Sequence, residues 1–326
     1  MTLFFLLAFI ISFLLTHIVK YAAQKKLILD VPNERSSHVK PTARGGGIAI
    51  ALTWFAGISY LYHHGNIEAK LYYALISGIL ISLIGFIDDI YNIKFYIRLI
   101  AQSIATMSAL YFLGGLNKFD CGFYTIENNF ILTTLALFGI IWFINLYNFI
   151  DGIDGYAASE AVFVSAALWF FTGHLSLLLL AFAVLGFLPL NWQKAKIFMG
   201  DTGSTLLGFS LAVFAIYLQN NSEFSILNWL ILTSIFWFDA TYTLFKRLVN
   251  KERITEAHKK HIYQRIVQWG FSHQKTVVYS LLINVILFIL VMFIQEHKNY
   301  TLMAFAFCLF FLTLIKNKVD KKKTFA

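Results

Sequence analysis

Apolar residues occur along this chain in repeated blocks of about 17–23 residues, separated by short polar linkers. A helix of that length crosses the roughly 30 Å hydrocarbon core of a membrane. Eleven such blocks are predicted to be membrane-spanning helices, near residues 2–19, 46–62, 71–87, 95–114, 130–149, 156–172, 175–190, 204–218, 226–245, 276–294 and 299–315. The linkers are too short for a second domain. The pattern therefore predicts an all-α, polytopic integral membrane protein whose single domain covers residues 1–326.

The composition supports the same conclusion. The 326 residues are 59% hydrophobic and only 13% charged. A soluble domain cannot bury that much apolar surface, because its surface grows too quickly relative to its volume. The first block does not look like a cleaved signal peptide, since its first basic residue, Lys20, follows the apolar stretch.

The net charge of +9 reports topology rather than a nucleic-acid partner. If the N-terminus lies outside and the blocks alternate in direction, 23 of the 26 Lys and Arg residues fall on inner loops or on the C-terminal tail. Only Lys70, Lys118 and Lys298 fall outside. This positive-inside pattern predicts an N-out, C-in protein. The two cysteines, Cys121 in an outer loop and Cys308 in the last block, are not expected to form a disulfide.

Five polar segments stand out against the apolar background. They all lie on the face that the Lys and Arg count assigns to the cytosol. Ionisable groups at a membrane edge are costly and are usually functional. We therefore expect a site at the cytosolic interface, built from "SSHVKPTARGGG" (36–47), "GFIDDIYNIK" (85–94), "NLYNFIDGIDG" (145–155), "IFMGDTGSTLLG" (197–208) and "EAHKKHIYQR" (256–265).

The segment around residue 150 places four polar residues three positions apart: Asn145, Asn148, Asp151 and Asp154. Each step of three drifts about 60° around a helix, so the first and last would face opposite ways in a straight helix. Two glycines follow the aspartates and offer a break at which the set could converge. The set is either a group of solvated residues at a helix end or part of a polyanion or metal site.

Asp88 and Asp89 close the third predicted span. Adjacent residues lie about 100° apart on a helix, so the two side chains cannot aim at one atom. One of them could serve a metal or phosphate while the other pairs with a lysine such as Lys94 or Lys40. An ordinary charged helix end is the alternative.

In "MGDTGS", Asp201 lies between glycines at the start of another predicted span. Helix N-termini offer free N–H groups and a positive dipole to phosphate. A neighbouring carboxylate suits Mg²⁺, which takes oxygen ligands and bridges to substrate phosphates. A simple N-cap is the alternative. The segment is not a Walker loop, because no GK[ST] follows the glycines.

Two further features are basic. His258 and His261 have spacing that could bind zinc, but the surrounding lysines and Arg265 favour a pyrophosphate instead. The "RGGG" at 44–47 either lets the backbone approach a ligand or lets helices pack, and Arg44 after Lys40 favours the ligand. Glu160 and Asp239 lie within predicted spans and are expected to face the bundle interior.

Taken together, the five segments resemble those of the polyprenyl-phosphate N-acetylhexosamine-1-phosphate transferases, the family that includes the phospho-MurNAc-pentapeptide translocase. The resemblance runs from Asp30 to about Arg265. It rests on the aspartate pair at 88–89, on Asn148, Asp151 and Asp154 in "NxxDGxDG", and on "FMGDTGS" at 198–204. "RSSHxxPTxRGGG" and "EAHxxHxYQR" look most like the subgroup that initiates O-antigen, although Ala43 stands where that subgroup usually has proline.

The resemblance implies transfer of a HexNAc-1-phosphate from a UDP-sugar to undecaprenyl phosphate with release of UMP, in the bacterial inner membrane with a cytosolic catalytic face. Mg²⁺, or Mn²⁺ in its place, is the implied cofactor, and a homodimer is allowed. By resemblance, Asp201 and Asp154 bind the metal, and Asp88 is the deprotonating base or its surrogate beside Asp89. The implied substrate-binding residues are Lys40, Arg44, Asn145, Asn148, Asp151, Asp154, His258, His261 and Arg265.

Two other classes of protein also carry polar residues on membrane helices. A secondary transporter or lipid flippase would place its polar residues near the bilayer midplane, commonly with repeated halves, and no repeat occurs here. A CDP-alcohol phosphatidyltransferase would carry "DGxxAR", whereas this chain has "DGYAAS". The sequence does not distinguish GlcNAc from a 6-deoxy HexNAc such as FucNAc or QuiNAc. It also leaves open the downstream glycan and whether the reaction takes one step or two.

Overall fold

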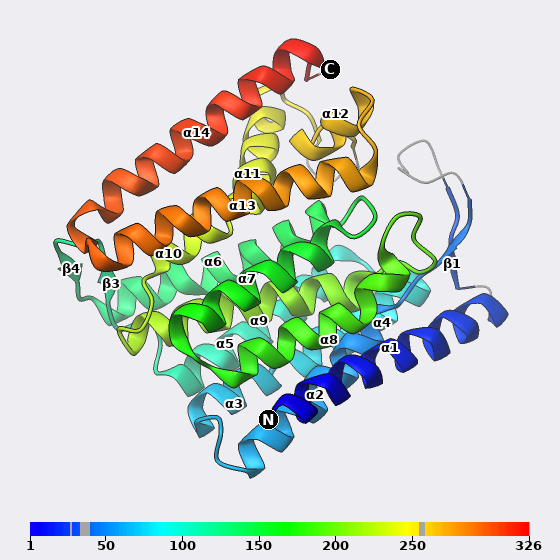
Figure 1. Cartoon of the computed structure of the whole chain (residues 1–326), viewed down its shortest axis with the longest axis horizontal. Coiled ribbons are helices and arrows are strands. Elements are labelled where there is room, and N and C mark those ends of the chain that lie inside the picture. The colour runs from blue at the N-terminus through cyan, green and yellow to red at the C-terminus, as the bar shows by residue number, and fades with distance from the viewer. Residues whose placement is uncertain (27, 33–39, 254–257, 326) are drawn as a thin grey trace.

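The computed structural model describes residues 1–326 except 27, 33–39, 254–257 and 326, so the predicted segments at 36–47 and 256–265 lie partly outside the described residues. Helices make up most of the described chain, which confirms the all-α prediction (Figure 1). The elements in chain order are α1 (Thr2–Lys25), β1 (Leu29–Asp30), β2 (Thr42–Ala43), α2 (Gly47–His63), α3 (Ala69–Ile76), α4 (Gly78–Tyr91), α5 (Phe95–Leu113), β3 (Phe119–Asp120), β4 (Thr125–Ile126), α6 (Asn129–Ile150), α7 (Tyr156–Thr172), α8 (Leu175–Asn191), α9 (Asp201–Asn220), α10 (Ile226–Leu232), α11 (Ser234–Val249), α12 (Ile262–Gln268), α13 (His273–Glu296), η1 (Lys298–Tyr300) and α14 (Thr301–Lys322). The strands form two antiparallel pairs, β1–β2 and β3–β4.

Helix α9 is the centre of the bundle. It contacts α2, α4 and α6 among others, and its most apolar stretch is entirely buried. The helix can lie there because small residues let its neighbours come close: a side chain added at Gly208 would meet Tyr147 and the backbone of Ile144. Small residues at helix interfaces are the usual means of close packing in membranes, where lipid supplies little hydrophobic driving force between helices.

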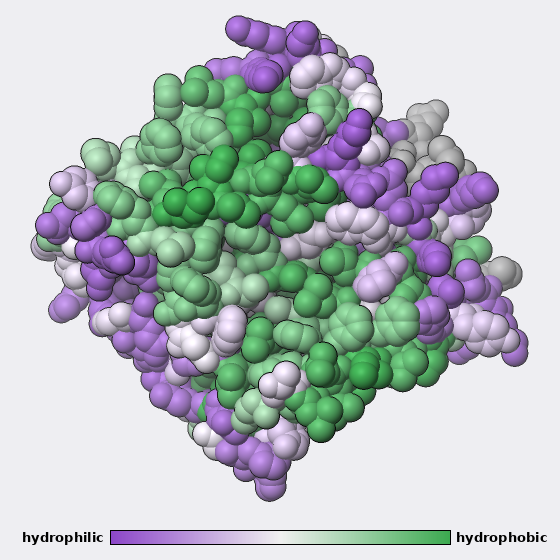
Figure 2. Space-filling model, in the orientation of Figure 1, coloured by the Kyte–Doolittle hydropathy of each residue, from purple (hydrophilic) through white to green (hydrophobic). Residues whose placement is uncertain are grey.

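The surface has the layout of a membrane protein. Figure 2 shows an apolar belt over the middle of the helices, with hydrophilic residues at the two ends of the bundle. Among the described residues, seven helical stretches are long and apolar enough to cross a membrane: 2–25, 69–91, 95–113, 129–150, 201–220, 273–296 and 298–322. Each of the eleven predicted blocks lies on a helix or on two consecutive helices. A multi-pass membrane protein is thus supported, while eleven crossings and the N-out orientation stay predictions.

Two predicted spans are interrupted, which the hydrophobic pattern did not predict. The block at 71–87 is divided between α3 and α4 at Ser77, whose hydroxyl donates to the carbonyl oxygens of Ala74 and Ala105. The block at 226–245 is divided between α10 and α11, where the Trp237 indole donates to the Leu230 carbonyl at 2.7 Å. In a membrane such breaks are tolerated because side chains satisfy the backbone groups that the break frees.

The two glycine-rich segments are joined by their backbones. The Phe198 N–H donates to the Ala43 carbonyl, and the N–H groups of Gly46 and Gly47 donate to the carbonyls of Phe198 and Met199, at 2.8–2.9 Å. A Cβ added at Gly47 would lie 2.2 Å from the backbone nitrogen of Gly203. The preferred interpretation of "RGGG" as a ligand-approach loop is therefore wrong for Gly46 and Gly47, which serve close packing of α2 against α9.

Candidate active site

Side chains from four helices and one loop form a charged cluster at the start of α9. Asp88 and Asp89 come from the end of α4, Arg98 from the first turn of α5 and Asn148 from the last turn of α6. Arg44 follows β2, and Asp201 is the first residue of α9. The three carboxylates are buried, at 5–7% exposure. This cluster, called here the carboxylate–arginine cluster, unites residues from four of the five predicted segments.

Asp89 caps helix α9. One of its carboxylate oxygens accepts from the backbone N–H of Asp201 at 2.8 Å, and the other accepts from the N–H and hydroxyl of Thr202 at 3.2 and 2.7 Å. A carboxylate at a helix N-terminus satisfies free N–H groups and interacts favourably with the helix dipole. The first N–H groups of α9 are therefore occupied in this structure, and the expectation that they are free for phosphate is wrong.

Two arginines connect the carboxylates. Arg44 contacts Asp89 at 2.9 Å and Asp201 at 2.6 Å. A single guanidinium nitrogen of Arg98 lies 2.7 Å from both Asp88 and Asp201. The two aspartates therefore pair with two different arginines. The prediction that one of them pairs with Lys94 or Lys40 is wrong. Lys40 is exposed, and within the described chain no contact joins its side chain to the cluster.

The four polar residues of 145–154 do not converge on one point. Asn148 donates to Asp201 at 3.1 Å and accepts from the Ser204 hydroxyl at 2.9 Å. Asn145 instead exchanges hydrogen bonds with Gln102 on α5. Because α6 continues to Ile150, the drift of about 60° per step separates these side chains.

Asp154 also lies apart from the cluster. Its carboxylate contacts the His273 ring at 3.2 Å and accepts from the Ala195 N–H at 3.3 Å. These contacts connect the loop after α6 to α13 and to the loop after α8. The structure therefore brings only Asn148 of this set into direct contact with Asp201, and it gives no contact between Asp154 and Asp201.

Asp151 follows the last residue of α6 and differs from its neighbours. Within the described residues, its carboxyl group has no hydrogen-bond or ion-pair partner, although it is partly buried. Burial, together with the negative charges of Asp201, Asp89 and Asp154, raises the pKa of Asp151 to about 7, against the opposing effect of Arg44. A carboxyl group with a pKa near neutrality can hold or release a proton at working pH.

The histidine segment packs on α11. The Nδ1 atom of His261 lies 3.2 Å from a carboxylate oxygen of Asp239, while His258 is partly buried beside it with ring centroids 4.9 Å apart. Arg265 is almost fully buried and pairs with Asp320 on α14. Its contacts therefore lead toward the C-terminal helix rather than toward the carboxylate–arginine cluster.

The donor groups of the cluster fit a hard divalent cation. Asp88 and Asp201 lie on either side of one Arg98 nitrogen, and a cavity of about 10 Å³ borders Arg98 and Asp201, roughly the room that one water molecule or ion needs. No group of three or more His, Cys, Asp or Glu residues able to hold a metal occurs among the described residues. Mg²⁺ usually takes only one or two protein carboxylates and keeps water and phosphate oxygens as its other ligands, so Asp201 and Asp88 are the residues that could hold it.

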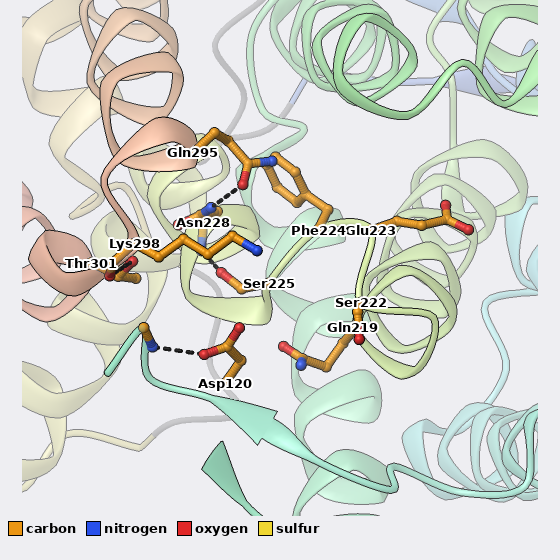
Figure 3. Close-up of a pocket in the computed structure, with 11 residues that line it drawn as sticks. Asp120, Gln219, Ser222, Glu223, Phe224, Ser225, Asn228, Gln295, Lys298 and Thr301 are labelled. Carbon is orange, nitrogen blue, oxygen red and sulfur yellow. Dashed lines mark hydrogen bonds between the residues drawn. The ribbon is translucent and has the colours of Figure 1, made fainter. Parts of the chain in front are cut away.

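A second polar pocket lies at the opposite end of the bundle (Figure 3). There the Asn228 amide donates to Gln295 at 3.3 Å and the Asp120 carboxylate accepts from the Gly122 N–H at 2.7 Å. The pocket has room of about 20 Å³, enough for one or two water molecules. Its lining includes Gln219, Ser222, Ser225 and Lys298. It contains none of the residues predicted to bind substrate.

Arg98 is the principal site residue that the sequence interpretation missed. Arg98 lies inside the predicted block 95–114. A charged residue within a membrane span is costly and usually functional, so its position inside the block was the available signal. Gln102 lies one turn further along α5 and was missed for a simpler reason, since an uncharged amide gives no such signal.

The part of the chain that contains most of the carboxylate–arginine cluster also matches known proteins. The family model described as glycosyl transferase family 4 matches residues 71–219. A probable undecaprenyl-phosphate N-acetylglucosaminyl 1-phosphate transferase of Bacillus subtilis is 33% identical over 298 residues, covering 86% of this chain and 82% of the relative.

Two other relatives carry different names. A decaprenyl-phosphate N-acetylglucosaminephosphotransferase of Mycobacterium leprae is 31% identical and covers 84% of this chain and 78% of its own length. A phospho-N-acetylmuramoyl-pentapeptide-transferase of Thermotoga petrophila is 29% identical over 74% of this chain and 80% of its own length. The matches to all three relatives extend well beyond the region that the family model covers.

Proposed function

Since this chain belongs to the polyprenyl-phosphate N-acetylhexosamine-1-phosphate transferases of glycosyl transferase family 4, we propose that it transfers an N-acetylhexosamine 1-phosphate from a UDP-sugar to undecaprenyl phosphate and releases UMP. The proposed sugar is GlcNAc, the sugar in the names of two of these relatives, or a 6-deoxy HexNAc such as FucNAc or QuiNAc. The product would start a lipid-linked O-antigen or a related envelope glycan. The proposed location is the bacterial inner membrane, with the carboxylate–arginine cluster facing the cytosol.

The observation that carries the proposal is the carboxylate–arginine cluster itself. In the proposed reaction, an oxygen of the lipid phosphate attacks the sugar-bearing phosphorus of the donor, the bond to the UMP oxygen breaks, and UMP leaves. Phosphoryl transfer needs positioning and charge stabilisation more than covalent chemistry. Arg44 and Arg98, each held by two carboxylates, are placed to bind phosphate oxygens.

In the proposed reaction, different residues handle the proton and the metal. Asp201 and Asp88 are the residues that would hold Mg²⁺, which would neutralise part of the diphosphate charge when bound. Asp154 is not included in this set, because its contacts are to His273 and Ala195. Asp151 has no hydrogen-bond or ion-pair partner within the described residues and has a raised pKa, so it is suited to take the proton of a lipid phosphate monoanion.

The proposed acceptor has a long apolar chain, and an apolar surface along α6 could receive it. An apolar cavity of about 280 Å³ lies between α6, α9 and α10. Its lining includes Leu132 near the start of α6 and Leu146 near its end, the latter adjacent to Asn145. A polyprenyl chain lying along this surface would bring its phosphate toward the end of α6, where Asn148 contacts Asp201.

UMP release tests the proposal. Purified protein in detergent is given Mg²⁺, a polyprenyl phosphate and each member of a UDP-HexNAc panel, with a no-lipid reaction as the control. The expected result is lipid-dependent UMP release with at least one HexNAc donor. No release with any donor, together with counterflow of a solute or lipid in proteoliposomes, would favour the transporter or flippase alternative. That alternative expects polar residues near the midplane, whereas the cluster here lies at helix ends.

A further inference from the structure

Asp239 on α11 is a buried carboxylate that no part of the proposed chemistry uses. It is 3% exposed and accepts four hydrogen bonds. The donors are the backbone N–H groups of Ile262 and Tyr263 at 2.8 and 3.0 Å, the Thr243 hydroxyl at 3.1 Å and the His261 ring at 3.2 Å. Asp239 therefore caps α12 and holds the histidine segment at the same time.

These contacts determine which ring nitrogen carries the proton in each histidine. A carboxylate can only accept, so His261 donates from Nδ1 and its neutral ring has an unprotonated Nε2. In His258 the opposite holds, because Nδ1 accepts from the Lys260 N–H at 3.2 Å and the proton of the neutral ring is on Nε2. The contacts to Asp239 and to the Lys260 N–H both use Nδ1 and leave the Nε2 atom of each ring for other partners.

The charge state of His258 supports this assignment. Burial, with the nearby His261 and Arg247, lowers the pKa of His258 to about 4, so the ring is neutral near pH 7. The two histidines thus offer different chemistry a short distance apart. His258 offers an N–H donor, and His261 offers an acceptor.

The segment held by Asp239 also reaches the loop after α6. The Tyr263 hydroxyl donates to the Phe149 carbonyl at 3.4 Å, and a Cβ added at Gly152 would lie 2.1 Å from the same hydroxyl oxygen. Tyr263 therefore packs directly against the loop that carries Asp151. A shift of α12 would move the histidines and this loop together.

We propose that Asp239 is a positioning residue for the sugar-phosphate part of the donor. It fixes the His258–Tyr263 segment so that Nε2–H of His258 donates to a phosphate oxygen and Nε2 of His261 accepts from a sugar hydroxyl. This inference rests on the proposed function, because it names the donor that the segment binds. It assigns no contact between Asp239 and the acceptor lipid.

Separate KM values for donor and acceptor test the inference. Asp239→Asn keeps the shape of the side chain but places an amide N–H₂ opposite groups that are themselves donors. The expected result is a donor KM raised about 10-fold or more, on the scale of leaving buried hydrogen-bonding groups unpaired. The KM for polyprenyl phosphate should not change, and kcat should stay within about threefold. Thr233→Val, which removes one buried hydroxyl just before α11, is the matched control and should change neither KM.

A milder variant keeps the test useful if Asp239→Asn does not fold. Ile262→Pro removes one of the two capping N–H groups at the first position of α12, where proline is tolerated. It should raise the donor KM in the same direction by a smaller factor. An unchanged donor KM in folded variants, or an equal rise in both KM values, would overturn the inference.

Ring-nitrogen NMR separates this inference from the proposed function. In protein labelled with ¹⁵N-histidine, the resonances lost in His261→Gln and His258→Gln assign the two rings. The wild type should show His261 protonated at Nδ1 and His258 at Nε2, and Asp239→Asn should lose the His261 preference. If the wild type releases no UMP from any donor, the proposed function fails while this readout still judges the Asp239 geometry. The same tautomer in both histidines would refute the geometry.

Discussion

The two ends of the helix bundle are built from polar residues of different kinds. At one end, Asp88, Asp89 and Asp201 lie buried together with Arg44 and Arg98 between them. At the other end, the pocket of Figure 3 depends mainly on neutral amides and hydroxyls, such as Gln219, which accepts from the Ile226 N–H at 2.8 Å. The His174 ring contacts the Glu223 carboxylate at that end, and both side chains are partly exposed.

The difference indicates what each end is for. The hydrogen bonds around the Figure 3 pocket close turns and cap helices, as Ser225 does for α10, and neutral groups are enough for that purpose. Burying three like charges beside one another is unfavourable unless each is paired, and hydrophobic residues of similar size often give equal or greater stability. The carboxylate–arginine cluster is therefore better explained by chemistry than by folding.

The largest expected difference between the ends concerns Asp201. Asp201→Asn keeps the size of the side chain but removes the charge that pairs with two arginines and is proposed to hold Mg²⁺. Its rate of UMP release should fall about 100-fold or more, the scale of losing one key electrostatic stabiliser. Asp120→Asn at the opposite end should be close to wild type. Full activity of Asp201→Asn, or of the wild type in EDTA, would remove Asp201 from the proposed metal site.

Arg98 gives the next largest effect. Without its guanidinium, Asp88 and Asp201 lose the cation they share. Arg98→Gln should reduce the rate of UMP release about 10-fold or more. It should also lower the melting temperature in EDTA. Added Mg²⁺ should raise the melting temperature of Arg98→Gln by more than it raises that of the wild type. Lys298→Gln at the opposite end is the matched control. Equal responses to Mg²⁺ in all three proteins would mean that no cation replaces Arg98.

The next prediction concerns stability rather than rate: Asp151 should give an effect on the melting temperature that depends on pH. Its pKa is about 7 in the folded protein against an ordinary value of 3.8, so the folded state holds the proton more tightly than the unfolded state. This stabilisation is complete below pH 4 and is lost as the pH rises to about 7 and above. Asp151→Asn should therefore melt at the same temperature as wild type at pH 4 but roughly 5 °C higher at pH 8 in EDTA. An equal difference at both pH values would contradict the raised pKa.

The smallest effect on activity is expected from Cys121, which lies between β3 and β4 near the Figure 3 end. Cys121→Ser should leave UMP release unchanged. On intact spheroplasts, an impermeant maleimide should label the wild type through Cys121 alone, because Cys308 is fully buried. Labelling that persists in Cys121→Ser would contradict the predicted topology, and with it the cytosolic position of the cluster.

The positions of the helices could be predicted from the sequence, but the contacts between residues of different helices could not. Long apolar blocks are a local signal, and each predicted block lies on helix. The breaks at Ser77 and Thr233 were missed because they depend on neighbours, such as the Ala105 carbonyl that accepts from Ser77. Hydropathy contains no information about that contact.

The same limit applies to the site. Asp88, Asp89, Asn148 and Asp201 could be selected because each stands out as polar at the edge of an apolar block. Their connections could not, since Asp89 caps a helix that begins 112 residues later. Convergence of Asn145 and Asp154 was expected from the glycine break after α6. Asn145 instead contacts Gln102, and Asp154, in the loop after α6, contacts His273.

The backbone contacts between residues 43–47 and 197–199 also bear on how the protein is made. Gly46 and Phe198, which they join, lie far enough apart in the chain that a ribosome adding 5–20 residues per second needs on the order of 10 s to travel between them. During that interval α2 has emerged and Arg44 has no carboxylate from α9 to pair with. The nascent protein must therefore keep the first turn of α2 in contact with water or lipid headgroups until α9 is synthesised. A ribosome that stalls before Asp201 would leave the N–H groups of Gly46 and Gly47 without the carbonyl partners that they have in the folded protein.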